Sequence, residues 1–308
     1  MTDPSRFSDH NTGIDAPESL PRSDSEAKEW QTANRDFWES NPMRYDWHES
    51  VQPEEFSELF YEEIDKRFFA DVSEYMPWDR RPFDNLIDFD SLKDQRVLEI
   101  GVGNGSHAQL LAASAGSYTG IDLTEYAVKS TSTRLRLRGI EATVQRMDAE
   151  NLSFPDASFD FVWSWGVIHH SSDTRAILRQ IHRVLKPGGK AVIMVYHRGW
   201  WNYYVLGGLV HGLVRGELLK TRSLFKTVQR QTDGALARYY AQNTWRSLVA
   251  DKFDVDYTTI TGSKTDVFPI PGGKVKSALM GSVPSRFTRF MTDQCQMGGF
   301  LISQIVKR

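Results

Sequence analysis

The stretch Val97-Leu98-Glu99-Ile100-Gly101-Val102-Gly103-Asn104-Gly105 decides the fold of this chain. It begins as an apolar run, passes through one acid and ends with a glycine at every second position. This order predicts a buried strand that leads through a tight turn into a helix, because glycine accepts positive φ and lets a ligand approach the backbone. A carboxylate just before the turn does not suit a phosphate, so Glu99 favours a nucleoside that presents hydroxyls or an ammonium group.

The composition is that of an ordinary globular protein and argues against several classes. Of the 308 residues, 40% are hydrophobic and 25% are charged, and the net charge of −3 gives no overall attraction for nucleic acid or anionic membranes. The single cysteine, Cys295, excludes an intrachain disulfide and a cysteine-based metal cluster. We see no signal peptide and no transmembrane run, so we expect a cytoplasmic protein without integral membrane association.

The most apolar stretch of the chain is Trp200 to Leu219, which polar residues and glycines interrupt. An interfacial membrane helix would carry more lysine and arginine on its polar face. We therefore interpret this stretch as a pair of helices on the protein or as a cap that faces the substrate.

Residues 96–197 alternate between strand and helix patterns. Strands are expected at 96–100, 118–121, 142–146, 159–165 and 190–196, and helices at 106–115, 125–138 and 174–185. Asp173 stands where the last helix needs an N-cap, and Pro187-Gly188-Gly189 stops that helix. Repeated strand–helix units predict an α/β fold, in which helices cover both faces of a parallel sheet.

The segments on either side of this core have a different character. Five parts are expected along the chain: a flexible tail at 1–28, a helical aromatic-rich lid at 29–95, the core at 96–197, a mainly helical substrate cap at 198–252, and C-terminal strands at 253–308. In the last two parts, 239–250 is the clearest helix, and 253–260 and 299–306 are the expected strands.

Open parallel sheets bind ligands beyond the carboxyl ends of their strands. Four features of this chain fall at such ends: Glu99 with the glycine turn, Asp122, the stretch 147–150 and the stretch 163–166. Asp122 can accept two hydrogen bonds from a ribose diol, and Asp148 can accept one from an exocyclic amine such as adenine N6. Leu123 and Ala149 can sandwich the ring between them. Together these residues predict an adenosine pocket.

Two cofactors contain an adenosine of this kind. NAD prefers Gly-x-Gly-x-x-Gly, but here the third glycine comes one residue early and Ser106 takes the last position. NAD also carries a pyrophosphate that Glu99 would repel. S-adenosylmethionine has no phosphate and presents an ammonium group, so Glu99 favours it.

Four ordered motifs then carry a family resemblance. They are 97–105, Gly120-Ile121-Asp122-Leu123, Asp148-Ala149-Glu150-Asn151-Leu152-Ser153-Phe154-Pro155-Asp156-Ala157-Ser158-Phe159-Asp160 and Arg183-Val184-Leu185-Lys186-Pro187-Gly188-Gly189. The chain resembles the class I S-adenosylmethionine-dependent methyltransferases, in the small-molecule group of the ubiquinone/menaquinone and sterol methyltransferases. The resemblance covers residues 95–197 and implies a Rossmann-like sheet of seven strands whose last strand is antiparallel.

The same resemblance implies roles for the motif residues. S-adenosylmethionine would be the cofactor and S-adenosylhomocysteine the product. Asp122 would bind the ribose hydroxyls and Asp148 the adenine amine, although Asp148 could also serve only as a loop cap. The turn of Gly101, Gly103 and Gly105 would hold the methionine portion, and the backbone near Trp163 and Ser164 would approach its amino-acid end.

A general base is useful only if the acceptor must lose a proton, since the leaving group of a sulfonium is neutral. The candidates are His169 and His170 beyond the fourth strand, and Tyr196 and His197 at the end of the fifth. One of the first two histidines could instead hold its loop by hydrogen bonding. The adjacent pair lacks the spacing of a metal site, so we expect no metal.

Aromatic residues on both sides of the core are candidates for the acceptor pocket. Trp38, Tyr45 and Trp47 would close over the cofactor, with aromatic faces toward the sulfonium and the Tyr45 hydroxyl within reach of a substrate. Trp200, Trp201, Tyr203 and Tyr204 follow the fifth strand, where the family places inserted caps, and would wall the acceptor pocket. A plain packing role is the alternative for both groups.

These observations predict a methyltransferase that acts on a small, partly apolar or lipid-like acceptor by in-line transfer. An RNA methyltransferase is one alternative, favoured only by the basic cluster of Arg134, Arg136 and Arg138. A protein that binds the cofactor without transferring a methyl group is another. A homodimer through the aromatic N-terminal helix also stays open.

Overall fold

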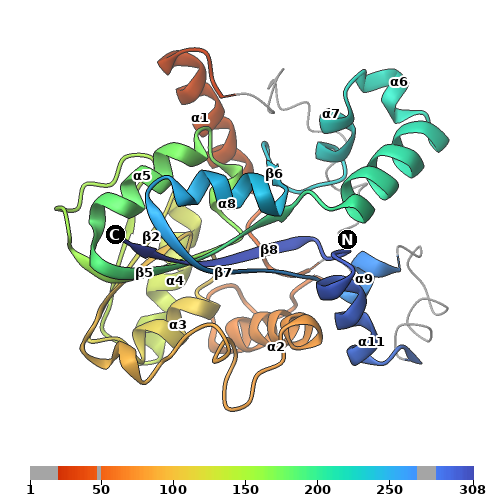
Figure 1. Cartoon of the computed structure of the whole chain (residues 1–308). Coiled ribbons are helices and arrows are strands. Elements are labelled where there is room, and N and C mark those ends of the chain that lie inside the picture. The colour runs from red at the N-terminus through yellow and green to blue at the C-terminus, as the bar shows by residue number, and fades with distance from the viewer. Residues whose placement is uncertain (1–19, 47–49, 269–281) are drawn as a thin grey trace.

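A mixed β-sheet forms the middle of the molecule (Figure 1), which we describe from a computed structural model over residues 20–46, 50–268 and 282–308. Its main strands are β1 (Arg96–Ile100), β2 (Ser117–Asp122), β3 (Thr143–Arg146), β4 (Phe159–Trp165), β5 (Leu185–His197), β7 (Phe253–Thr261) and β8 (Phe300–Lys307). Their order is β3-β2-β1-β4-β5-β8-β7, and a short strand, β6 (Tyr239–Tyr240), pairs with the end of β5.

The directions of the strands confirm the predicted fold class. β1 to β5 are parallel, whereas β8, the last strand of the chain, runs antiparallel to both β5 and β7. The chain winds outward from β1 to β3 and then returns to place β4 on the other side of β1. This reversal leaves a crevice at the carboxyl end of β1, where such sheets bind ligands.

Helices cover both faces of the sheet because each has an apolar side to bury. On one face, α5 (Thr174–Val184) and α8 (Gln242–Ala250) bury Ile177, Ile181 and Trp245. On the other face, α2 (Glu58–Tyr75), α3 (Ser106–Ala112) and α4 (Glu125–Leu137) pack residues such as Phe68 and Leu135. Figure 1 shows α5 and α8 above the sheet and α2 and α3 below it.

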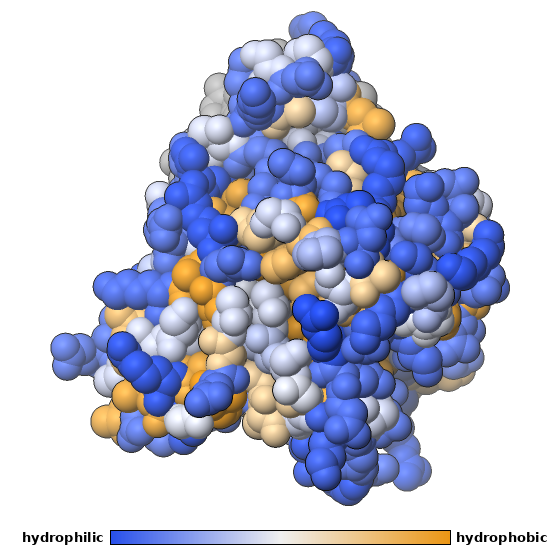
Figure 2. All heavy atoms as spheres, turned by 90° about the vertical axis from the view of Figure 1, so that its left-hand side faces the viewer, coloured by the Kyte–Doolittle hydropathy of each residue, from blue (hydrophilic) through white to orange (hydrophobic). Residues whose placement is uncertain are grey.

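η2 (Ser91–Asp94) directly precedes β1, and the other elements gather near the carboxyl ends of β4 and β5. These are η3 (Ile168–His170), η4 (Trp200–Val214), α6 (Glu217–Thr221), α7 (Leu224–Gln229), α9 (Lys264–Val267), α11 (Ser285–Arg289) and η5 (Phe290–Gln294). The opposite end of the molecule faces the viewer in Figure 2, and hydrophilic residues cover most of it. In the ranges described, no helix combines the length and the apolar character that crossing a bilayer requires.

Several expected boundaries were wrong, among them the start of β5 at Leu185 and the end of α3 at Ala112, and for three others the reason can be identified. α1 (Asp24–Ser40) starts inside the expected tail, because Ser23 accepts a hydrogen bond from the backbone of Glu26 as an N-cap and Trp30 is buried. The expected helix 239–250 begins with β6, since the end of β5 offers its edge for pairing. The helix expected at 174–185 ends at Val184, because Leu185 already pairs with β4.

Candidate cofactor and acceptor site

A cavity of about 850 Å³ lies at the carboxyl ends of the parallel strands. Its floor is the glycine turn after β1 together with the ends of β2 and β4. The other walls come from α1, α2 and η4, which contribute Gln31, Asn34, Trp38, Arg67, Asp71, Tyr75, Asn202 and His211. The sheet therefore forms one end of the cavity, and the helical segments form the other end.

The glycine turn needs its glycines for two different reasons. Gly101, Gly103 and Gly105 all have positive φ, of 83°, 51° and 81°. A Cβ at Gly101 would collide with Val167, whereas a Cβ at Gly103 would meet no atom within 4 Å. Since all three glycines line the cavity, the turn leaves room for a ligand to lie against its backbone.

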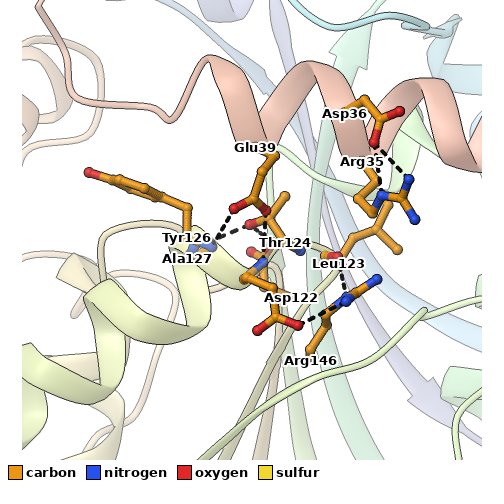
Figure 3. Close-up of polar contacts among 10 residues, drawn as sticks. Arg35, Asp36, Glu39, Asp122, Leu123, Thr124, Tyr126, Ala127 and Arg146 are labelled. Atoms are coloured by element: carbon orange, nitrogen blue, oxygen red, sulfur yellow. Dashed lines mark hydrogen bonds and ion pairs between the residues drawn. The ribbon is translucent and has the colours of Figure 1, made fainter.

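Asp122 presents its carboxylate at the end of β2, beside this turn (Figure 3). It accepts hydrogen bonds from the backbone and hydroxyl of Thr124, at 3.0 and 2.8 Å, and from the backbone of Gly103 at 3.3 Å. Burial raises the pKa of Asp122, while these hydrogen bonds oppose the shift. The carboxylate is held in place by the backbone and faces the cavity, as a ribose-binding acid should.

Asp148 and its neighbours form the next part of the wall. Met147, Asp148 and Ala149 line the cavity with Leu123, as predicted for an adenine slot. The Asp148 carboxylate accepts a hydrogen bond from the Gln31 side chain at 2.9 Å and from the backbone of Glu150 at 2.8 Å. Asp148 thus caps its own loop, and it also meets a residue of α1.

Glu99 is predicted as a cofactor-binding residue, but it does not line the cavity. Its side chain is 1% exposed, and Oε2 accepts a hydrogen bond of 2.6 Å from the Tyr118 hydroxyl of the neighbouring strand. Oε1 has no hydrogen-bond partner among the described residues and lies 4.0 Å from Nδ1 of His107, which does line the cavity. Burial raises the pKa of Glu99 to about 8, so the carboxyl group is mostly neutral at pH 7.

The fourth strand reaches the cavity two residues later than predicted. Trp163 and Ser164 are fully buried in the sheet and are absent from the cavity wall, where Trp165 and Gly166 stand instead. The Trp163 ring stacks on Trp165 at 5.3 Å within the core beneath α2 and α3. β4 ends at Trp165 as expected, but its backbone stays within the sheet up to that residue, and the chain lines the cavity only from Trp165 into the turn at Gly166, whose φ is 72°.

His170 has a defined tautomer and faces the cavity. Nδ1 lies 2.6 Å from the carbonyl oxygen of Leu236, and because a carbonyl can only accept, Nδ1 carries the proton and Nε2 is the basic nitrogen. Burial lowers the pKa of His170, so the ring is neutral near pH 7. Asn34 of α1 donates a hydrogen bond to the His170 carbonyl, which fixes the loop from the other side.

His169, predicted as a catalytic residue, does not line the cavity. The ring is fully buried and lies between His170 at 4.2 Å and Tyr196 at 4.0 Å. Neither ring nitrogen has a hydrogen-bond partner within the part of the chain that the structure describes, and burial lowers the pKa of His169 well below its ordinary value. His169 packs behind His170, between that ring and the ring of Tyr196, and does not line the cavity itself.

Tyr45, Tyr196 and His197 all line the cavity. The Tyr196 hydroxyl donates a hydrogen bond of 2.7 Å to Asp233, and burial raises the pKa of Tyr196 well above its ordinary value. Nδ1 of His197 bonds to the carbonyl of Gly298 at 2.9 Å. The Tyr45 ring rests on Phe68 with centroids 5.0 Å apart, and burial raises its pKa as well.

The predicted aromatic walls divide between the cavity and other surroundings. Trp38 lines the cavity and contacts His170 edge-on at 5.1 Å, whereas Trp47 lies outside the described residues. The cavity is not lined by the four residues predicted to wall the acceptor pocket, Trp200, Trp201, Tyr203 and Tyr204. Trp200 and Tyr204 point outward at 50% and 48% exposure, and the other two pack inside the cap. The reason is that η4 turns Asn202, between them, toward the cavity.

Sequence reasoning missed several polar residues of the wall. Gln31, Asn34, Asp71, Asn202, His211, Asp233 and Asp266 all line the cavity, and no motif marks any of them. Their positions on α1, α2 and the cap depend on how these segments fold over the sheet. A search of the described residues for a group of His, Cys, Asp and Glu that could hold a metal ion finds none.

The residues present fit S-adenosylmethionine. The glycine turn offers open backbone, Asp122 and Asp148 offer carboxylates at the ends of two adjacent strands, and Leu123 and Ala149 offer apolar surface between them. The unpartnered Oε1 of Glu99 lies one side chain away from the cavity, next to His107.

Comparison with known proteins agrees with this geometry. The family described as "Methyltransferase domain" matches residues 98–193, from β1 into β5. The 27-O-demethylrifamycin SV methyltransferase of Amycolatopsis mediterranei is 38% identical over 101 residues, which are 32% of this chain and 37% of that protein. The phthiotriol/phenolphthiotriol dimycocerosates methyltransferase of Mycobacterium tuberculosis is 40% identical over 100 residues, 32% of this chain and 36% of that protein.

A solved structure extends the likeness of the fold beyond this segment. A SAM-dependent methyltransferase from Methanosarcina mazei, 21% identical, superposes with a TM-score of 0.51 over 75% of this chain and 99% of its own. The curated relatives are matched over little more than a third of their length, so their similarity bears on the core of the sheet. Residues 98–193 are a methyltransferase domain of the class I family that uses S-adenosylmethionine.

Proposed function

We propose that the chain transfers a methyl group from S-adenosylmethionine to a small, partly apolar acceptor. The observation that carries the proposal is the single cavity in which the glycine turn, Asp122 and Asp148 meet a neutral histidine, His170. The two relatives are named for 27-O-demethylrifamycin SV and for phthiotriol and phenolphthiotriol dimycocerosates. Names of this kind favour a small molecule over a macromolecule as the acceptor.

Some residues of the cavity would bind the cofactor, and another would accept a proton from the acceptor. When bound, S-adenosylmethionine supplies an electrophilic methyl group. Asp122 would hold the ribose and Asp148 the adenine, which fixes the methyl group relative to the helical end of the cavity. Nε2 of His170 would accept the proton of an acceptor hydroxyl or amine. The side chains of α1, which cover the cavity, would exclude water.

The test begins with cofactor affinity, measured by titration calorimetry. Asp122→Ala removes both charge-assisted hydrogen bonds to the ribose, so S-adenosylmethionine should bind about 10- to 100-fold more weakly. Asp122→Asn keeps the shape but removes the charge and replaces one acceptor oxygen with an NH₂ donor, so circular dichroism of both variants separates a loss of binding from a loss of folding. Asp251→Ala, at an exposed aspartate, should leave the affinity unchanged.

Transfer itself is tested with isotope-labelled cofactor and a metabolite extract, followed by mass spectrometry of the products. A labelled small molecule that forms with the wild-type chain supports the proposal. Failure to bind S-adenosylmethionine would sink it. Binding without a labelled product from any extract would instead favour a cofactor-binding protein that does not transfer the methyl group.

A further inference from the structure

Exposed large hydrophobic side chains concentrate on one segment of the described chain. Six of the eleven lie within residues 200–219, at exposures from 48% to 84%, and they are Trp200, Tyr204, Leu209, Leu213, Val214 and Leu219. We call these six residues the outer stripe. A single exposed hydrophobic residue is ordinary, but a contiguous group of this size marks an interaction surface.

The geometry of η4 explains why the outer stripe is continuous. η4 is a π-helix, closed by bonds such as that from Arg215 N to the Val210 oxygen, five residues back. Trp200, Tyr204, Leu209 and Leu213 are spaced four or five residues apart, about one turn of such a helix, so they share one side. The cavity-lining residues Asn202, Gly207 and His211 are offset by two residues, about half a turn. The same helix thus faces the cavity on one side and solvent on the other.

Basic side chains surround the outer stripe. Residues 200–230 contain five Lys and Arg and a single acid, Glu217, although the whole chain has a net charge of −3. Four of the five, Arg215, Lys220, Arg222 and Arg230, are exposed. The stretch 200–219 alone holds only one basic residue, which is why the sequence argued against an interfacial helix. α6 and α7 pack against η4 and bring the others to its rim.

We propose that the outer stripe docks the protein onto a membrane surface that contains anionic lipid. Apolar side chains would enter the boundary between headgroups and acyl chains, and the basic rim would meet the lipid phosphates. Trp200 and Tyr204 at one end are of the residue types that favour this boundary. A second copy of the chain is a poorer occupant, because a two-fold contact through the stripe would bring two basic rims together.

The position of the stripe gives the docking a use. In Figure 1 the helical hairpin that ends in α6 projects beyond the carboxyl end of β5, and Asn202 and His211 of η4 line the cavity. An apolar acceptor that partitions into a bilayer would then be presented to the inner face of the same helix. The docking itself does not depend on the proposed methyl transfer, so the two can fail separately.

Sedimentation of the full chain with lipid vesicles tests the proposal. We expect binding to vesicles of phosphatidylcholine mixed with phosphatidylglycerol, weaker binding to phosphatidylcholine alone, and a decrease with added salt. Leu213→Gln combined with Leu219→Gln should weaken binding to the mixed vesicles about tenfold or more. Arg215→Gln combined with Arg222→Gln should remove the preference for the anionic vesicles.

The matched control is Leu59→Gln, at a leucine of α2 that is 65% exposed and outside the stripe, and it should bind as the wild type does. Circular dichroism and affinity for S-adenosylmethionine show whether each variant is folded. The proposal is overturned if the wild-type chain binds neither kind of vesicle. It is also overturned if the double leucine variant binds the mixed vesicles as well as the wild type does. It is also overturned if ultracentrifugation finds a dimer that the double variant breaks and the vesicles capture nothing, since the stripe would then be a contact between copies.

Discussion

At the scale of single residues, His170 both holds a loop and faces the cavity. Its protonated Nδ1 bonds to Leu236, and this bond leaves Nε2 free of its proton on the cavity side. The carbonyl of the same residue accepts from Asn34. The two interpretations of this histidine, a loop anchor and a proton acceptor, are therefore compatible, because they use different nitrogens of one ring.

Replacing His170 should affect transfer and not cofactor binding. His170→Gln should lower kcat by roughly 10²- to 10⁴-fold, the usual contribution of a general base, and leave the affinity for S-adenosylmethionine within about twofold. His182→Gln, a histidine on the outer helix α5, is the matched control and should be active. Labelled-methyl transfer and calorimetry measure the two quantities, and a variant with full activity would remove His170 from the chemistry.

The pH profile of the wild type follows from the same residue. Burial lowers the pKa of His170 below 6.5, and a general base must be unprotonated to act. We expect kcat/KM to be level at pH 7 and above and to fall as the pH drops through this lowered pKa. A profile that instead declined between pH 7 and 8 would show that a protonated group is needed.

Glu99 is a second residue whose burial has a measurable consequence. Its pKa rises from 4.5 to about 8 on folding, so the folded chain holds an extra proton between these values. The stabilisation of the folded state that comes from this proton is therefore fully present below pH 4.5. It is lost as the pH rises toward 8.

Glu99→Gln stays neutral and still offers an oxygen to the Tyr118 hydroxyl. The free energy of unfolding of the variant should therefore exceed that of the wild type by an amount that grows with pH. Between pH 5 and pH 8 this difference should increase by about 1 kcal/mol per pH unit. Urea unfolding at several pH values measures it, with the exposed Glu62→Gln as the control. An equal difference at pH 5 and pH 8 would contradict the raised pKa.

At the scale of elements, α1 is bonded across the loops that bind the cofactor. Gln31 donates to Asp148, and at the other end of α1 the Glu39 carboxylate accepts from the backbone of Glu125 and Tyr126 at 2.8 and 3.1 Å (Figure 3). These two N–H groups belong to the first turn of α4, directly after the loop of Asp122. α1 thus satisfies donors that α4 cannot satisfy itself.

Removing the Glu39 carboxylate should loosen this lid. Glu39→Ala should lower the free energy of unfolding by about 1 kcal/mol, as the loss of a helix cap does, and speed the dissociation of S-adenosylmethionine. Glu29→Ala is the control, since the exposed Glu29 side chain, on the same helix, accepts a hydrogen bond of 3.5 Å from the neighbouring Ser25 and does not line the cavity. Stopped-flow fluorescence measures the dissociation rate. An unchanged rate would mean that α1 does not restrain the cofactor.

At the scale of the whole molecule, the distribution of charge bears on the kind of acceptor. The basic cluster that favoured RNA is divided, because Arg134 is 1% exposed and paired with Asp65 inside the fold. Only Arg136 and Arg138 of that cluster stay at the surface.

With a net charge of −3 and that cluster divided, we expect no binding of labelled RNA in fluorescence anisotropy at about 0.15 M salt. The Arg215→Gln and Arg222→Gln variant would show whether any binding seen at lower salt comes from the rim of the outer stripe. Tight, salt-dependent binding of the wild type would favour the RNA alternative.

The sequence by itself determined the core of this protein. The glycine turn, the acids at the ends of β2 and β3 and the alternation of strand and helix are local patterns, each set by neighbouring residues, and they predicted the α/β sheet and the cofactor. Tertiary structure decided the rest. Glu99 lies outside the cavity wall, bonded to Tyr118 on the adjacent strand, and His170 lines the cavity while the ring of His169 lies 4.2 Å behind it. η4 exposes Trp200 and Tyr204 because its turns close over five residues, and no local pattern states which side of a helix its neighbours will cover.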